Sequence, residues 1–136
     1  MVRTSLIHLL AGMALGGVLL ANAGLGYPVR VPPLGASHAH LILVGWLLQF
    51  ALGIAYWLLP RRRRADNPEA YSVPLAFTGY TLLNCGLVVR VLLEPVNGSG
   101  GGLVGLLLVG SALVQVSAGA IFVAQLWRRV RERPAV

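Results

Sequence analysis

Hydrophobic residues fall into four long blocks along this chain, separated by connections that are polar or rich in glycine and proline. At a rise of about 1.5 Å per residue, each block is long enough to cross a hydrocarbon layer of about 30 Å as a helix. The pattern predicts an all-α membrane protein in which residues 1–136 form a single transmembrane domain. The four expected transmembrane helices cover approximately residues 5–25, 37–59, 72–93 and 102–127.

The first block also permits a different interpretation. It follows Met1-Val2-Arg3 and ends near an Ala-Asn-Ala run at residues 21–23, which fits the basic start, apolar middle and A-x-A end of a signal peptide. We treat the block as the first helix. After it, three prolines between residues 26 and 35 prevent a continuous helix, so this connection is expected to be extended.

The composition supports a membrane protein and argues against a nucleic-acid partner. Of the 136 residues, 57% are hydrophobic and 11% are charged, and the mean hydropathy is +0.76. These values are too apolar for a soluble domain of this length. The net charge is +7, but the arginines gather at the ends of apolar blocks and not on an amphipathic face. The expected partner of the chain is therefore the lipid bilayer.

The distribution of arginine predicts how the chain is oriented in the membrane. Four consecutive arginines, at 61–64, follow the second block, and four more, at 128, 129, 131 and 133, follow the last block. The turn at residues 97–102 carries no charge, and Arg30 is the one charge of the first connection. Cytoplasmic loops are enriched in basic residues, so both termini are expected in the cytoplasm, N-in and C-in. The expected location is the cell inner (cytoplasmic) membrane, with a multi-pass topology.

Two histidines open the second block, in the run His38-Ala39-His40. Two residues apart on a helix, their imidazoles point about 200° apart and face different neighbours. Histidine within a membrane span is costly unless it is paired, ligated or in a polar cavity, so each is a candidate functional residue. The simpler alternative is that both lie in the headgroup region. His8 is expected near the inner face, a full membrane thickness away and too far to share a ligand with them.

The two histidines lie on different helix faces. His38 shares its face with Gly45, Gln49 and Tyr56, at offsets of 7, 11 and 18 residues. Gly45, two turns below the imidazole, is expected to leave a flat slot, whereas the face below His40 is wholly apolar. Zinc requires three or four converging ligands, but haem requires only one axial nitrogen on each side, an apolar envelope and cations for its propionates. The pair therefore fits haem better than zinc.

Arg90 lies at the expected depth of the two histidines, about one turn from the outer end of the third block. Two interpretations remain open. Arg90 pairs with Glu94, four residues further on, and extends towards the membrane surface, or it contacts an anionic group of a ligand. Arg30, in the first connection, is the second candidate for such a contact.

Two further patterns concern packing between helices. Gly12 and Gly16 form a small-residue face that allows another backbone to approach closely. Gln49, Asn84 and Gln115 lie near the middle of their blocks. Because an amide side chain is unfavourable towards lipid, all three are expected to face protein, where they are able to hydrogen-bond one another.

Residues 38–60 resemble the tenth transmembrane helix of subunit I of haem-copper oxidases. The resemblance rests on the His-x-His run, on Gly53 fifteen positions after His38, and on Pro60 twenty-two positions after it. In that helix the first histidine holds the high-spin haem and the second holds the low-spin haem. The run also resembles that of small four-helix proteins related to this subunit or to nitric oxide reductases.

The resemblance implies a fold and a site. The oxidase subunit consists of three arcs of four helices, with the haem-bearing helix second in its arc, as the second block is here. Arg90 is similar in place to arginines that hold haem propionates. The third block, however, carries no histidine pair, and the second has no ligand resembling that of the copper site. Copper binding and oxygen reduction are therefore not implied, and an enzymatic activity is not expected.

These observations predict a haem b-binding integral membrane protein that transfers electrons or holds haem through iron ligands His38 and His40, with Gly45, Arg90 and Arg30 beside the cofactor. The expected bis-histidine haems lie at subunit interfaces of a homotrimer, with a two-fold dimer as the rival. One alternative is a cofactor-free structural or assembly subunit, and another is a gas-binding haem sensor or reductase-like protein. No motif identifies the redox partner.

Overall fold

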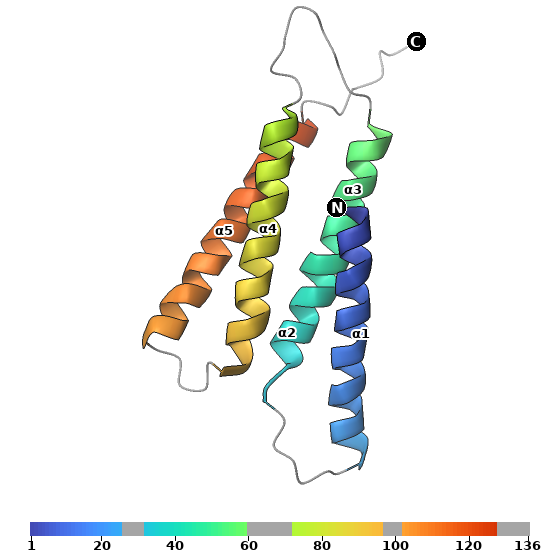
Figure 1. Cartoon of the computed structure of the whole chain (residues 1–136), viewed down its shortest axis with the longest axis vertical. Helices are drawn as coiled ribbons and strands as arrows, with labels where there is room; N and C mark the ends of the chain where they lie inside the picture. Colours follow the sequence, from blue (N-terminus) through green and yellow to red (C-terminus); the bar gives the residue numbers. More distant parts are fainter. Residues whose placement is uncertain (26–31, 60–71, 97–101, 128–136) are drawn as a thin grey trace, which may run out of the picture.

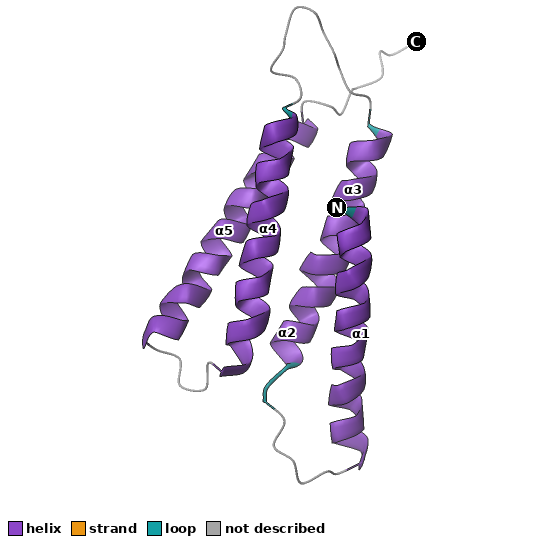
Figure 2. Ribbon diagram, in the orientation of Figure 1, coloured by secondary structure: helices purple, strands orange, loops and turns teal. Residues whose placement is uncertain are grey.

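The computed structural model describes residues 1–25, 32–59, 72–96 and 102–127, and these ranges contain helices and no strand. Figure 2 shows this all-helical architecture. The first span is α1 (Val2–Leu25). The second is continuous but consists of three parts: α2 (Gly35–His40), the π-helix η1 (Leu41–Leu48) and α3 (Gln49–Leu58). The third and fourth are α4 (Val73–Leu93), which continues into the short 3-10 helix η3 (Glu94–Val96), and α5 (Gly102–Trp127).

All four spans are long and apolar enough to cross a membrane, which confirms the prediction of an all-helical protein with four such segments. Many large apolar side chains point away from the rest of the molecule, as expected for a surface that contacts lipid. Examples from three of the spans are Leu20, Trp57, Leu103 and Trp127, which are 73–80% exposed.

The sequence explains where two of the spans begin. The second span starts at Gly35, shortly after Pro32 and Pro33, which cannot continue a preceding helix. The third span, α4, starts after Ser72, whose Oγ accepts a 3.3 Å hydrogen bond from the backbone nitrogen of Leu75. Such a cap satisfies one of the free N–H groups at a helix start.

The spans form two antiparallel hairpins that lie side by side (Figure 1). One consists of α1 and the segment α2–η1–α3, and the other of α4 and α5. Contacts join the hairpins at both ends. Near the start of α2, Ser37 Oγ donates a 3.1 Å hydrogen bond to the carbonyl oxygen of Val91. Near the end of α3, the rings of Tyr56 and Phe122 meet edge to face with their centroids 6.0 Å apart.

Glycines set the register of the first hairpin. A Cβ on Gly12 would lie 2.6 Å from Ile42 Cδ1, and a Cβ on Gly53 would lie 2.7 Å from Val2 Cγ2. The small-residue face predicted on the first block therefore packs against the second span. Gly53 of the second span in turn packs against the start of α1. In this register α1 starts partway along the second span, and its other end extends past α2 (Figure 1).

The three amides predicted at mid-depth are not joined to one another by hydrogen bonds among the described residues. Gln49 is 0% exposed, as expected, and its Nε2 donates to the carbonyl oxygen of Met1 at 3.4 Å. Asn84 Nδ2 donates to the Tyr80 carbonyl oxygen, 2.8 Å away on the same helix. Gln115 packs against α4. No hydrogen bond joins any two of the three among the described residues, and each keeps one amide atom without a partner there.

Candidate functional site

His38 projects from α2 onto the glycine face of α1. Its Nδ1 lies 2.8 Å from the carbonyl oxygen of Gly12. The ring lies so close to the next glycine of the face that a Cβ on Gly16 would be 2.8 Å from its Cε1 atom. The same two glycines that allow the helices to approach therefore form the surface on which this imidazole rests.

His40 faces the other hairpin. Its Nδ1 lies 2.9 Å from the carbonyl oxygen of Ala36, one turn earlier, and 3.2 Å from Oε1 of Glu94, at the start of η3. The two imidazoles thus face different neighbouring helices, which confirms the prediction from their spacing. Both histidines are half-buried, so part of each ring remains at the surface of the single chain.

The two histidines share one feature that matters for ligand binding. A carbonyl oxygen can only accept a hydrogen bond, so Nδ1 is the donor in each ring. In a neutral imidazole the other nitrogen, Nε2, then carries a free lone pair. Histidines that bind metals are commonly held in this way, with one nitrogen donating to a carbonyl or carboxylate and the other bound to the metal. The donor set therefore suits an axial iron ligand.

Arg90 and Glu94 form the ion pair that was one of the two interpretations of Arg90. The Nε atom of the arginine lies 2.8 Å from Oε1 of the carboxylate, one helical turn away. The same oxygen faces His40, so a carboxylate is shared by a guanidinium and an imidazole. This contact also confirms that Arg90 lies at the depth of the two histidines. The Nε contact leaves the terminal nitrogens of the guanidinium available to an anionic ligand.

The predicted position of His8 is wrong. Instead of lying a membrane thickness from His38, it packs against η1, with its Nδ1 3.1 Å from the carbonyl oxygen of Gly45. Gly45 is seven residues from His38 along the second span, a rise of about 10 Å. The prediction placed α1 at the same depth as the second span. In the structure, the glycine contacts shift α1 along that span.

Gly45 does not provide the flat slot that was predicted below His38. A Cβ on this glycine would lie 2.9 Å from His8 Cβ and 2.9 Å from Leu87 Cδ2, so two side chains from α1 and α4 already fill the space. The predicted face is confirmed in part. His38 and Gly45 contact α1, and Gln49 contacts Met1 directly before it, but Tyr56, the fourth member, packs against Phe122 of α5. Arg30, the second candidate for contact with a ligand anion, lies outside the described residues.

The π-helix was not predicted. It starts at Leu41, directly after His40, and continues to Leu48, so it connects the histidine pair to the middle of the second span. The run is uniformly apolar apart from Gly45, and no pattern in it predicts a wider helix. Short π-helical segments inside α-helices occur frequently at functional sites. Here the Gly45 carbonyl also accepts the hydrogen bond from His8.

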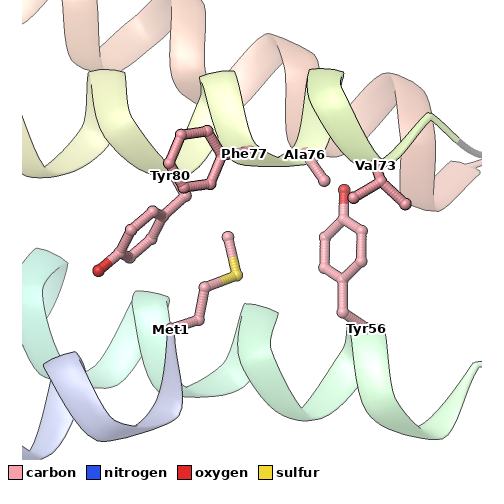
Figure 3. A pocket seen from close by; sticks show the side chains of 6 residues that line it. All are labelled: Met1, Tyr56, Val73, Ala76, Phe77 and Tyr80. Atoms are coloured by element: carbon pink, nitrogen blue, oxygen red, sulfur yellow. The ribbon is translucent and has the colours of Figure 1, made fainter.

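A cavity of about 370 Å³ lies between the two hairpins, away from the histidine pair. Figure 3 shows the side chains of Met1 and Tyr56 facing those of α4 across this space. The hydroxyl of Tyr80 is within 2.8 Å of Thr4 Oγ1, which links α1 and α4 beside the cavity. The cavity is lined by Met1, Tyr56, Val73, Ala76, Phe77 and Tyr80. None of these is a histidine, so the cavity is separate from the candidate ligand site.

Within the described ranges, no three His, Cys, Asp or Glu side chains gather where they could hold a metal ion together. A haem iron requires fewer protein ligands, because the porphyrin supplies most of its ligands and the protein supplies only the axial ones. Comparison of the chain with protein-family models, curated proteins and solved structures gives no match. The resemblance to one arc of an oxidase subunit therefore stays a prediction that rests on the His-x-His run.

Proposed function

We propose that this protein is a haem b-binding, multi-pass protein of the cell inner membrane that transfers electrons or holds haem, with Nε2 of His38 and of His40 as iron ligands. One observation carries the proposal. Both imidazoles, at one end of an apolar span, donate Nδ1–H to a backbone carbonyl and so keep Nε2 for a ligand. The haem would supply the one-electron redox chemistry.

Other residues of the chain have roles in this proposal. The terminal guanidinium nitrogens of Arg90 are suited to donate to a propionate, since its contact with Glu94 uses Nε. Arg30 is proposed as a second propionate partner. The exposed apolar side chains of the spans supply the apolar envelope that a porphyrin requires. Gly45 has no direct role beside the cofactor in this proposal, because His8 and Leu87 cover it.

The two imidazoles cannot clamp one haem within a single copy, because they face different helices. His8 does not supply the second iron ligand within a single copy either. Its depth differs from that of His38 by about 10 Å, whereas both nitrogens on one iron must approach it within about 2 Å. We therefore propose that His38 of one copy and His40 of the next bind the same haem. Such a head-to-tail contact either closes into a ring or continues without end. We propose a closed ring of three copies, which correspond to the three arcs of the oxidase subunit.

An absorption spectrum of the detergent-purified protein tests the proposed function. The expected result is a Soret band, with sharp α and β bands on reduction that carbon monoxide leaves unchanged, because six-coordinate iron has no open position. No Soret band in protein expressed with sufficient haem would contradict the proposal and favour a cofactor-free structural subunit. Reduced bands that shift with carbon monoxide would favour a gas-binding haem protein.

The orientation is tested by labelling a single cysteine. Position 99 lies in the uncharged turn, which the positive-inside rule places outside the cell. Ser99→Cys in a Cys85→Ser background is therefore expected to react with a membrane-impermeant maleimide added to intact cells. A cysteine at position 67, beside the four arginines, is the matched control and should react only after the membrane is opened. The opposite pattern would reverse the proposed N-in and C-in orientation.

A further inference from the structure

Glu94 is the one acidic residue within the described ranges, and it lies among basic and polar groups. Oε1 is 2.8 Å from Nε of Arg90 and 3.2 Å from Nδ1 of His40. Its side chain is 11% exposed, and its Oε2 is buried without a hydrogen-bond partner among the described residues. The effective dielectric constant around a buried carboxylate is low, so each neighbouring charge or dipole interacts strongly with it.

An ion pair with Arg90 does not by itself account for this arrangement. Arg90 and Glu94 are neighbours on one helical segment and would pair wherever α4 was placed. His40 belongs to the other hairpin, fifty-four residues earlier in the chain. Its approach to the carboxylate depends on how α2 packs against α4, two helices that the hydrogen bond from Ser37 to Val91 also joins.

The two candidate iron ligands consequently differ in chemical environment. His38 Nδ1 bonds only a backbone carbonyl among the described residues. His40 Nδ1 bonds the Ala36 carbonyl and in addition lies 3.2 Å from a carboxylate oxygen of Glu94. A carboxylate beside an imidazole N–H polarises that bond and so makes the second ring nitrogen a stronger electron donor.

We propose that Glu94 is a positioning residue that holds the His40 ring and makes its Nε2 a stronger electron donor than that of His38. The part of this inference that concerns iron rests on the proposed function. A stronger donor stabilises ferric over ferrous iron, so Glu94 lowers the midpoint potential of a haem bound by His40. Arg90 competes for the same oxygen and limits this effect.

The direct test is nitrogen and proton NMR of the imidazoles in the whole protein as purified, without added haem. The chain contains three histidines, so single substitutions assign each signal. Glu94→Gln keeps the shape of the side chain and removes its charge, and it is expected to move the Nδ1–H signal of His40 to lower chemical shift. The signals of His38 and His8 are internal controls for folding, because their Nδ1 atoms bond backbone carbonyls.

Glu94→Asp separates the close contact with His40 Nδ1 from the general effect of a nearby charge. Aspartate keeps the charge but is shorter by one methylene, about 1.5 Å, so it is expected to lose the contact and to shift the His40 signal as glutamine does. If Glu94→Asp leaves the signal at its original position, a general field effect is the better explanation. If neither substitution moves the His40 signal, the inference is overturned.

A second measurement applies to haem-loaded protein. Glu94→Gln is expected to raise the midpoint potential, and Arg90→Gln is expected to lower it, because that substitution frees the carboxylate for His40. Equal potentials in all three proteins would overturn the inference for the iron ligand. A protein that binds no haem but has a Glu94-dependent His40 signal would refute the proposed function while supporting the positioning role of Glu94. Thus the two proposals can fail separately.

Discussion

Replacing either His38 or His40 with alanine is expected to remove the bis-histidine haem spectrum completely. Each haem in the proposed ring needs one ligand of each kind, so the loss of either residue affects every site. Substituting a residue that only hydrogen-bonds a metal ligand reduces metal affinity by about 10–100-fold, and the loss of the ligand itself should exceed this range. Haem content is measured from the ratio of Soret to protein absorbance, and oligomeric state by light scattering in detergent.

His8→Ala is the matched control for these two variants. His8 is also a half-buried histidine in a membrane span with Nδ1 on a backbone carbonyl, but it belongs to the contact between α1 and η1. Its removal is therefore expected to leave the haem spectrum and the oligomer unchanged. Equal haem loss in all three variants would point to general destabilisation, and a silent His38→Ala or His40→Ala would contradict the shared-haem ring.

Mixing the two variants provides a further check on the head-to-tail contact. In a mixed ring, His38 from a copy lacking His40 can meet His40 from a copy lacking His38 at some interfaces, but not at all of them. The expected result is partial recovery of haem, below the wild-type content. Full recovery, or a haem-loaded particle that is a monomer or a two-fold dimer, is incompatible with the trimer.

The helical architecture was predictable because its causes are local. Length and hydropathy identify the four spans, and helical periodicity assigns His38, Gly45 and Gln49 to one face, which contacts α1 and Met1. Both patterns depend only on residues near one another in the chain. The small-residue face at Gly12 and Gly16 was likewise identifiable from spacing alone.

The remaining features depend on contacts between distant segments. The shift of α1 along the second span follows from how Gly12 fits Ile42, and it moved His8 from its expected depth to a contact with Gly45. The meeting of His40 and Glu94 depends on the packing of two hairpins. Glu94 was identified as a partner of Arg90 because the two are four residues apart, but no local pattern connects it to His40.

Gly16→Leu is expected to disrupt haem binding without any change in a ligand. The Cβ of a side chain at this position would lie 2.8 Å from Cε1 of His38, closer than van der Waals contact allows. The imidazole is rigid and is held by Gly12 on the same face, so it must rotate away and lose its hydrogen bond to that carbonyl. Overpacking of this kind destabilises a protein by about 1–3 kcal/mol.

Gly17→Leu provides the control, because a Cβ at that position has no atom within 4 Å. Both substitutions increase helix propensity by the same amount, close to 1 kcal/mol, so a difference between the two variants reports the contact with His38. We expect Gly16→Leu to weaken haem binding by about 10–100-fold, as does the loss of other hydrogen bonds that orient a metal ligand, and Gly17→Leu to match the wild type. Haem titration measures both affinities, and circular dichroism checks that helix content is retained. Equal affinities in the two variants would show that His38 does not bind haem from its position on the glycine face of α1.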